Sequence, residues 1–110
     1  MWQKEIWMAD LEPIKGREQG GRRLVVIISG NTMNEHYAVR IICPLSSQVK
    51  NFAGCVLLKK DKINRLPKDS EVLTFQLRTI STSRLIKKIG QVTPEQLRQI
   101  RLFLNEILTY

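Results

Sequence analysis

Two arginines that follow two glycines are the part of this sequence best suited to chemistry on a phosphate. Residues 18–23 read Glu-Gln-Gly-Gly-Arg-Arg and lead into an apolar run at 24–29. Glycines let the backbone turn tightly, and an arginine at the start of a stiff strand can bind a phosphate at little ordering cost. Arg22 and Arg23 are therefore candidate phosphate ligands, although the local pattern is equally compatible with a hairpin turn whose arginines are solvated.

Polar residues elsewhere in the chain are candidates for the same site. With the two arginines, the set is Arg22, Arg23, Ser46, Ser47, Gln76, Arg78 and Arg84. Guanidinium and hydroxyl groups that converge on a phosphodiester stabilise the extra charge of a pentacoordinate transition state without a metal. RNA suits such a site because its own 2′-hydroxyl can act as the nucleophile. The alternative is that these groups are scattered over the surface.

Several other chemistries lack the residues they need. His36 is the only histidine, which excludes a two-imidazole acid-base mechanism within one subunit. The sequence contains no nucleophile elbow, phosphate-binding Walker loop, dinucleotide fingerprint or metal-spaced cluster. Asp10 and Glu12 form a conceivable metal pair, but solvated carboxylates at a strand end are far commoner. We therefore expect no metal and no cofactor.

Composition indicates a basic, single-domain protein. The chain has 110 residues, 43% of them hydrophobic, which fits one domain over 1–110 with one core. Its 18 Lys and Arg against 10 Asp and Glu give a net charge of +8, which favours a polyanionic partner. Cys43 and Cys55 have no metal-binding spacing and are expected to be small buried hydrophobes in a reducing compartment; a disulfide is possible but not implied. The lack of a leader and of a membrane-length apolar run predicts a cytoplasmic protein.

The hydrophobic pattern predicts mostly strands before a terminal helix. Strands are expected at 5–11, 24–29, 38–43, 56–58, 70–79 and 88–92, with a helical turn at 34–37. Pro44 is expected to end the third strand. Strict alternation in 70–79 predicts one half-buried strand with Gln76 and Arg78 on its polar face.

The last element is predicted to be an amphipathic helix. Thr93, Pro94 and Gln96 have the types and spacing of a capping box with proline at the first helical position. The apolar positions form one stripe: Leu97, Ile100, Phe103, Leu104, Ile107 and Leu108. We expect this stripe to cover a compact, mainly antiparallel sheet or barrel, a partner groove being the alternative.

Segments along nearly the whole chain match one family in type and order. They are residues 6–13 and 16–23, the run Cys-Pro-Leu-Ser-Ser at 43–47, and the stretches at 75–80 and 83–90. The sequence thereby resembles the MazF/PemK-type toxins of type II toxin-antitoxin systems. This resemblance implies an SH3-like, partly closed antiparallel β-barrel with a C-terminal helix, related to the CcdB/PemK fold.

The resemblance also implies an activity and its partners. Family members are homodimers that cleave single-stranded RNA at short sequences by 2′-hydroxyl attack, leaving a 2′,3′-cyclic phosphate and a 5′-hydroxyl without a metal. The family's catalytic arginine falls on Arg23, its catalytic threonine on Ser46, and an RNA-binding glutamine on Gln76. A cognate MazE-like antitoxin is implied, and the +8 charge predicts that it is acidic and partly disordered.

The remaining expected RNA contacts are Arg22, Glu18, Gln19, Ser47, Lys50, Arg78 and Arg84. Because arginine almost never loses its proton, Arg23 is not expected to act as a general base. We assign to it stabilisation of the phosphate charge and proton donation to the leaving 5′-oxygen. Base choice is expected from loops at 15–20 and 47–54, where Phe52 is either a stacking ring or a loop anchor.

Three departures from the family pattern stand out. Leu24 replaces a proline, which loosens how the arginine is aimed. Ser46 keeps the hydroxyl of threonine but lacks the methyl that restricts its rotamer. Lys4 and Glu5 replace a common Gly-Asp and put no catalytic role in doubt.

Two other functions remain open on the sequence. One is a CcdB-like toxin that poisons gyrase through protein contact, which would leave RNA whole. The other is a basic nucleic-acid-binding module, which would bind phosphate in a salt-dependent way without forming product.

Overall fold

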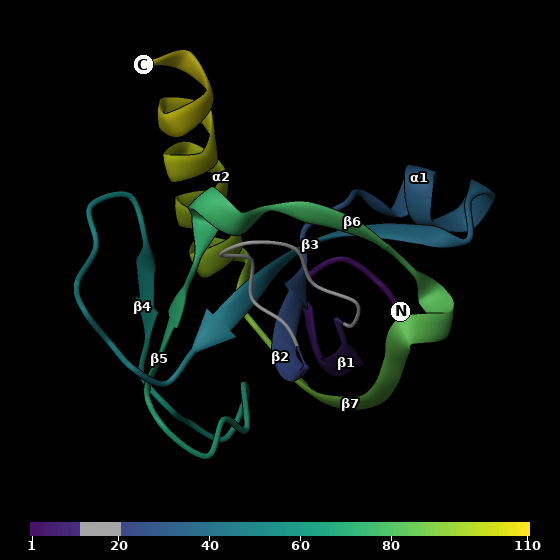
Figure 1. Ribbon diagram of the computed structural model, residues 1–110, viewed down its shortest axis with the longest axis horizontal. Coiled ribbons are helices and arrows are strands. Elements are labelled where there is room, and N and C mark those ends of the chain that lie inside the picture. Colours follow the sequence, from purple (N-terminus) through teal and green to yellow (C-terminus); the bar gives the residue numbers. More distant parts are fainter. Residues whose placement is uncertain (12–20) are drawn as a thin grey trace.

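The computed structural model describes residues 1–11 and 21–110 (Figure 1). The strands are β1 (Glu5–Asp10), β2 (Arg22–Ile27), β3 (Val39–Ser46), β4 (Val56–Leu58), β5 (Ser70–Val72), β6 (Arg78–Ser81) and β7 (Leu85–Gln91). The helices are α1 (Asn31–His36) and α2 (Pro94–Thr109), with 3-10 turns η1 (Thr74–Gln76) and η2 (Thr82–Arg84). The loops predicted at 15–20, with Glu18 and Gln19, lie outside the described residues.

The strands form one antiparallel sheet that branches at β3. Its order is β4-β5-β3-β2-β1-β7, and β6 pairs with β3 off this path. Among the described strands the sheet does not close on itself, since β4 and β7 are its two ends. The expectation of a mainly antiparallel sheet with a C-terminal helix is confirmed.

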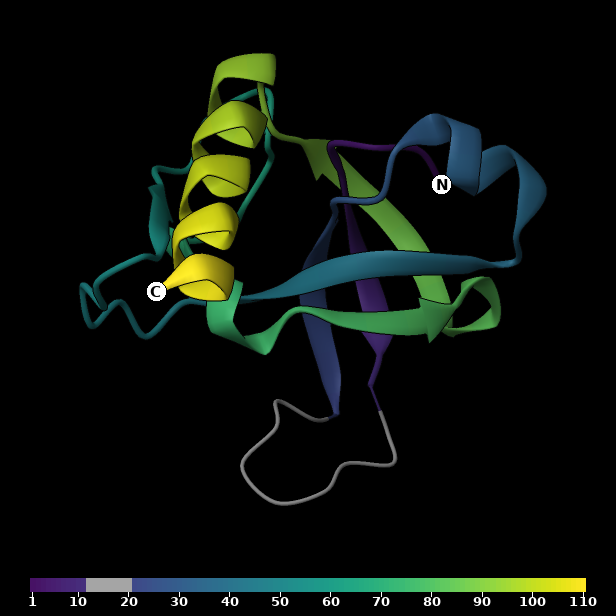
Figure 2. The same cartoon turned by 90° about the horizontal axis from the view of Figure 1, so that it is seen from above.

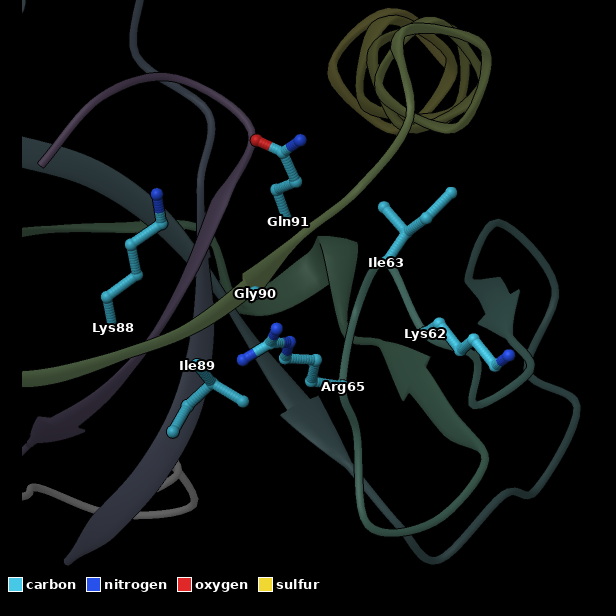
Figure 3. Close-up of a pocket in the computed structure, with 7 residues that line it drawn as sticks. All are labelled: Lys62, Ile63, Arg65, Lys88, Ile89, Gly90 and Gln91. Carbon is cyan, nitrogen blue, oxygen red and sulfur yellow. The ribbon is translucent and has the colours of Figure 1, made fainter.

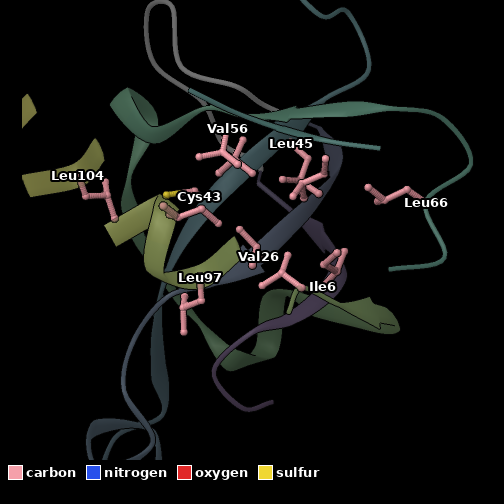
Figure 4. Close-up of a cluster of buried hydrophobic side chains, with 12 residues drawn as sticks. Ile6, Val26, Cys43, Leu45, Val56, Leu66, Leu97 and Leu104 are labelled. Atoms are coloured by element: carbon pink, nitrogen blue, oxygen red, sulfur yellow. The ribbon is translucent and has the colours of Figure 1, made fainter. Parts of the chain in front are cut away.

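Two clusters of buried side chains stabilise the fold. The first lies between α2 and the sheet, and Ile6, Val26, Leu97 and Leu104 belong to it (Figure 4). The second lies on the other face of β1, β2 and β3 and includes Val25, Ile27, Ile42 and Ile80. Alternation along β2 sends Val25 and Val26 to different clusters, which explains why this strand is a continuous apolar run.

Helix α2 begins as the sequence predicts. The Thr93 hydroxyl accepts the backbone N–H of Gln96, and the Gln96 side chain accepts the N–H of Thr93, forming a capping box. Leu97, Ile100 and Leu104 of the predicted stripe are buried against the sheet. The prediction of a buried stripe is wrong at its end, where Leu108 is 75% exposed, because the C-terminal end of α2 projects beyond the sheet (Figure 1; Figure 2 shows the same helix from above).

Pro44 does not end its strand, which is a correction to the sequence prediction. β3 continues to Ser46, and Pro44 pairs in register with Val25 of β2. On the other side of β3, pairing with β6 ends at Ile42 and pairing with β5 begins at Leu45. Pro44, which has no N–H, therefore lies between the part of β3 that pairs with β6 and the part that pairs with β5. Its missing donor costs the sheet few hydrogen bonds there.

The predicted strand over 70–79 is also wrong. The chain forms β5, then η1, then β6, so Thr74 is buried and Phe75 is 53% exposed, the reverse of the alternation. The Thr74 hydroxyl donates to the Gly54 carbonyl at 2.6 Å, and the N–H of Leu77 donates to the Thr74 carbonyl. These bonds turn the backbone where the sequence pattern predicts an extended strand.

The two cysteines differ in environment. Cys43 is buried in the first cluster, and burial raises the pKa of its thiol to about 12. Cys55 is only half-buried, so the expectation that both are buried holds for Cys43 alone. Both are free thiols.

Glu5 makes folding stability depend on pH. Burial raises its pKa, but hydrogen bonds outweigh burial, chiefly from the Trp7 indole at 2.9 Å and the Trp2 N–H at 3.1 Å, and lower it from 4.5 to about 2. The stabilisation is therefore complete above pH 4.5 and lost as pH falls towards 2. We expect the unfolding free energy to fall over this window, with a shallower slope in Glu5→Gln. An equal slope in denaturant titrations of both proteins would contradict this role.

Candidate nucleic-acid interface

The start of β2 carries the two arginines into a basic pocket. The pocket has a volume of about 270 Å³ and is lined by Met8, Arg22, Arg23, Leu24, Leu45, Ser47, Pro67, Lys68 and Ser70. We call it the arginine pocket. Its lining contains three cationic side chains and no carboxylate. Such a lining attracts an anion, and guanidinium groups match the geometry of a phosphate.

Arg84 lies at the same edge of the sheet. β1 ends, and β2 and β7 begin, at this edge, where Asp10 pairs with Arg22 and Ala9 pairs with Leu85. The Arg84 Nη1 donates to the Asp10 carbonyl at 3.2 Å. The sheet thus places Arg84 beside the strand pair that carries Arg22, although they are more than 60 residues apart in sequence.

A second pocket lies at the end of β3. Its volume is about 340 Å³, and it is lined by Ser46, Gln48, Lys50, Phe52, Leu73, Phe75 and Gln76. We call it the aromatic pocket. It brings together the predicted catalytic residue Ser46 and two predicted RNA contacts, Lys50 and Gln76. The Ser46 hydroxyl accepts the Gln48 N–H at 3.2 Å, which leaves its own O–H to donate to a ligand.

Strand β3 separates the two pockets at its last residues. Side chains alternate along a strand, so Leu45 and Ser47 line the arginine pocket and Ser46 lines the aromatic pocket. Pairing of β3 with β2 ends at Pro44 and Val25. Ser46 follows Pro44 by two residues, and Arg23 precedes Val25 by two residues in the antiparallel partner. The structure therefore places Arg23 with Ser47 in one pocket and Ser46 in the adjacent one, on either side of the same strand end.

Arg78 lines neither the arginine pocket nor the aromatic pocket. It begins β6 and pairs in register with Ile42, a residue of the second buried cluster. Its side chain is half-buried. The prediction that Arg78 lies with Gln76 on one polar strand face is wrong, because Gln76 ends the 3-10 turn η1 whereas Arg78 begins strand β6.

Sequence reasoning missed some residues of these pockets. Lys68 and Ser70 line the arginine pocket, and Phe75 lines the aromatic pocket. The alternating pattern assigned Phe75 to the buried face, so its only sequence signal was its place in the 75–80 stretch that matches the family. Lys68 follows Pro67 in a polar segment, a position where a lysine is usually only solvated.

A third and larger pocket, of about 470 Å³, lies beside β7 (Figure 3). Its basic groups do not converge: the Arg65 side chain points towards β7, the Lys62 side chain points away, and the Lys88 ammonium lies 3.3 Å from the Glu5 carboxylate. This pocket therefore has weaker anion-binding character than the arginine pocket.

The described residues contain no cluster suited to a metal. Within 1–11 and 21–110, no group of three or more His, Cys, Asp or Glu side chains has the arrangement to hold a metal ion. In the same part of the chain, none of the helices has the length and apolar character of a membrane span.

The fold and the arginine pocket define a small, mainly β protein with an anion-binding edge. The chain belongs to the family of PemK-like, MazF-like toxins of type II toxin-antitoxin systems, whose family model matches residues 3–108. A curated relative, the endoribonuclease MazF of Staphylococcus saprophyticus, is 32% identical over 98 residues, covering 87% of this chain and 81% of the relative. The family resemblance drawn from the sequence is confirmed.

Solved structures show the same fold. MazF from Deinococcus radiodurans superposes with a TM-score of 0.81 at 24% identity, covering 99% of this chain and 96% of that one. A mycobacterial endoribonuclease solved in complex with its cognate antitoxin gives a TM-score of 0.80 at 20% identity, covering 98% and 94%.

Proposed function

We propose that this protein is an endoribonuclease toxin that cleaves single-stranded RNA at short sequences without a metal. The observation that carries this proposal is the arginine pocket, which has three cations and no carboxylate beside a strand end that presents two hydroxyls. Its curated relative is an endoribonuclease. This relationship favours the nuclease over the gyrase poison and over a module that only binds nucleic acid.

The scissile phosphate is proposed to lie across the end of β3, between the two pockets. The RNA 2′-oxygen forms a bond to phosphorus and gives its proton to solvent, while the bond to the 5′-oxygen breaks and the leaving 5′-oxygen takes up a proton from solvent. The products are a 2′,3′-cyclic phosphate and a 5′-hydroxyl. Arg23, which stays protonated, neutralises the added charge of the transition state and hydrogen-bonds the leaving oxygen. Ser46 donates its O–H to a non-bridging oxygen from the aromatic pocket.

Several other residues are proposed to bind the RNA away from the reacting atoms. Arg22 and Ser47 lie in the arginine pocket, Lys50 and Gln76 in the aromatic pocket, and Arg84 at the neighbouring strand edge. Cations at these positions bind the phosphate backbone irrespective of sequence. Arg78, Glu18 and Gln19 remain proposed contacts on the family resemblance alone.

The partners follow from charge and from the relatives. A mycobacterial relative forms a complex with its cognate antitoxin, and MazF of Deinococcus radiodurans with MazE. We propose that an acidic antitoxin segment covers the basic pockets of this chain, whose net charge is +8. We further propose that the chain is a single toxin domain that acts as a homodimer in the cytoplasm.

The proposal is tested by exposing mixed RNA briefly to the purified protein and sequencing the fragments. Cleavage at a short sequence with cyclic phosphate and 5′-hydroxyl ends, in the presence of EDTA, is expected. Intact RNA would contradict the nuclease and favour a gyrase poison. Salt-sensitive binding without product would identify a binding module.

The two serines separate the roles of the two pockets. Ser46→Ala is expected to lower kcat by roughly 10- to 100-fold, because it removes a hydrogen bond to a charged group. Ser46→Thr, which keeps the hydroxyl, should retain most of the activity. Ser47→Ala is the matched control and should change kcat far less. Single-turnover cleavage of one RNA by the three variants gives the comparison, and a larger loss for Ser47→Ala would move the catalytic hydroxyl into the arginine pocket.

A further inference from the structure

We propose that Phe52 and Phe75 form a stacking wall for one RNA base next to the scissile phosphate, and that Glu71 positions this wall. The inference rests on the proposed ribonuclease function. It assigns a role to two residues, Glu71 and Phe75, that the sequence did not indicate.

The two rings form an exposed aromatic pair. Their centroids lie 5.7 Å apart with an interplanar angle of 86°, an edge-to-face contact. Phe52 is 45% exposed and Phe75 is 53% exposed, although buried positions would suit both rings better. Both line the aromatic pocket. A nucleobase can therefore stack on an aromatic surface that is already in place.

Glu71 fixes the loop that carries Phe52. Its side chain is buried in β5, and its two carboxylate oxygens accept the N–H groups of Lys50 at 3.2 Å and Phe52 at 3.0 Å. Asn51, between them, has a φ of 54°, a left-handed conformation that asparagine tolerates better than most residues. One carboxylate thus binds both sides of a tight turn, and such charge-assisted bonds are stronger than neutral ones.

A second contact ties the end of the same loop to the segment that carries Phe75. The Thr74 hydroxyl donates to the Gly54 carbonyl at 2.6 Å. Residues 50–54 are therefore attached to the 71–76 segment at both ends, which places the Phe52 ring against the Phe75 ring. The wall is preorganised, so little ordering entropy is lost when a base binds.

The residues around the Phe52 and Phe75 rings indicate that the ligand is a base of the RNA substrate. Ser46 and Gln76 line the same pocket, with Lys50 at its side. A base on the rings lies within reach of the Gln76 amide, which carries both a donor and an acceptor. Its phosphate lies towards Ser46. This arrangement fits a nucleotide directly flanking the cleaved bond.

The rings are tested with RNA in which one nucleotide flanking the cleavage site is replaced by an abasic one. In the wild-type protein, removing the stacked base should raise KM by roughly 5- to 150-fold. Phe75→Leu should raise KM for intact RNA by a similar factor with kcat unchanged. In this variant the abasic substitution should cause no further rise in KM, the rise that we call the abasic penalty. Phe75→Trp, which keeps a ring, should restore both.

The matched control is Tyr37→Leu. This variant removes an exposed ring that lines neither pocket and should leave KM unchanged. Thermal unfolding verifies that each variant is folded. Wild-type protein that cleaves no RNA would contradict the proposed function. Cleavage by Phe75→Leu with wild-type KM, or with an undiminished abasic penalty, would overturn the stacking wall alone.

The role of Glu71 is tested with Glu71→Gln, which leaves one acceptor and turns an NH₂ group towards the other loop N–H. The amides of Lys50 and Phe52 should exchange with solvent faster, while that of Val26 in the core keeps its protection. KM should rise and the abasic penalty should shrink, with kcat retained. If the Lys50 and Phe52 amides exchange faster while KM and the abasic penalty stay at their wild-type values, the proposed role of Glu71 as a positioning residue is overturned.

Discussion

Replacing Arg23 with alanine is expected to reduce the rate of RNA cleavage by about 100- to 1000-fold, the loss typical of removing one donor to a developing anion. Arg23 is exposed at the start of β2 and lines the arginine pocket. Its exposed side chain contributes little to the core, so the variant should remain folded. The measurement is single-turnover cleavage of a defined RNA, with the far-ultraviolet dichroism and the oligomeric state as controls.

Two further variants separate charge from geometry at this position. Arg23→Lys keeps the charge but loses the planar fork that binds two phosphate oxygens, so it should recover only part of the rate. Arg101→Ala removes one charge from α2, at an exposed residue that lines neither pocket. It should leave the rate nearly unchanged. Cleavage by Arg23→Ala within a few-fold of wild type would remove this residue from the mechanism.

Replacing Gly90 with alanine is expected to destabilise the fold by about 3 kcal/mol or more. A Cβ atom at Gly90 would lie 2.2 Å from the Asn64 carbonyl oxygen and 2.7 Å from that of Ile63 (Figure 3 shows Gly90 on β7). These neighbours are backbone atoms, so no side chain can rotate away to make room.

The opposing segment cannot easily move either. The buried Asn64 side chain accepts the N–H groups of Asp61 and Leu66 at 3.0 Å each and donates to the Lys59 carbonyl at 2.8 Å. The Gln91 N–H also donates to the Ile63 carbonyl. Relieving the clash would break part of this buried hydrogen-bond network.

Denaturant unfolding measures the effect, and Gly30→Ala is the control. No atom lies within 4 Å of a Cβ built at Gly30, whose φ of −65° and ψ of 153° suit any residue. This control should cost no more than about 1 kcal/mol, the loss of a favoured helix cap. Equal midpoints for Gly90→Ala and the wild type would show that the 59–66 segment can shift away from β7.

Local chemistry made some elements predictable. The Thr93 and Gln96 capping box defines the start of α2, because both of its hydrogen bonds join residues three apart. The apolar run of β2 was predictable because this strand is buried on both faces, and the alternating burial of Val25 and Val26 between two clusters confirms it.

The two wrong strand predictions, at 70–79 and at Pro44, have their cause in contacts between residues far apart in the sequence. The alternation at 70–79 satisfies the period of a strand, but the bond from Thr74 to the Gly54 carbonyl, 20 residues earlier, turns the chain into η1. The prediction that Pro44 ends its strand was wrong for the same reason. Strand β3 changes its pairing partner from β6 to β5 at this point, so the sheet needs no N–H from Pro44 there.

The sequence by itself determined the family, the antiparallel sheet with its terminal helix, and the candidate arginine and hydroxyl groups, because residue types and short spacings encode them. Only the tertiary structure decided that Ser47 shares a pocket with Arg23 while Ser46 shares one with Gln76. It also placed Phe75 outside the core and set Glu71 under the loop of Phe52. The physical reason is that strand pairing and long-range hydrogen bonds, which join residues far apart in the chain, set which side chains face one another.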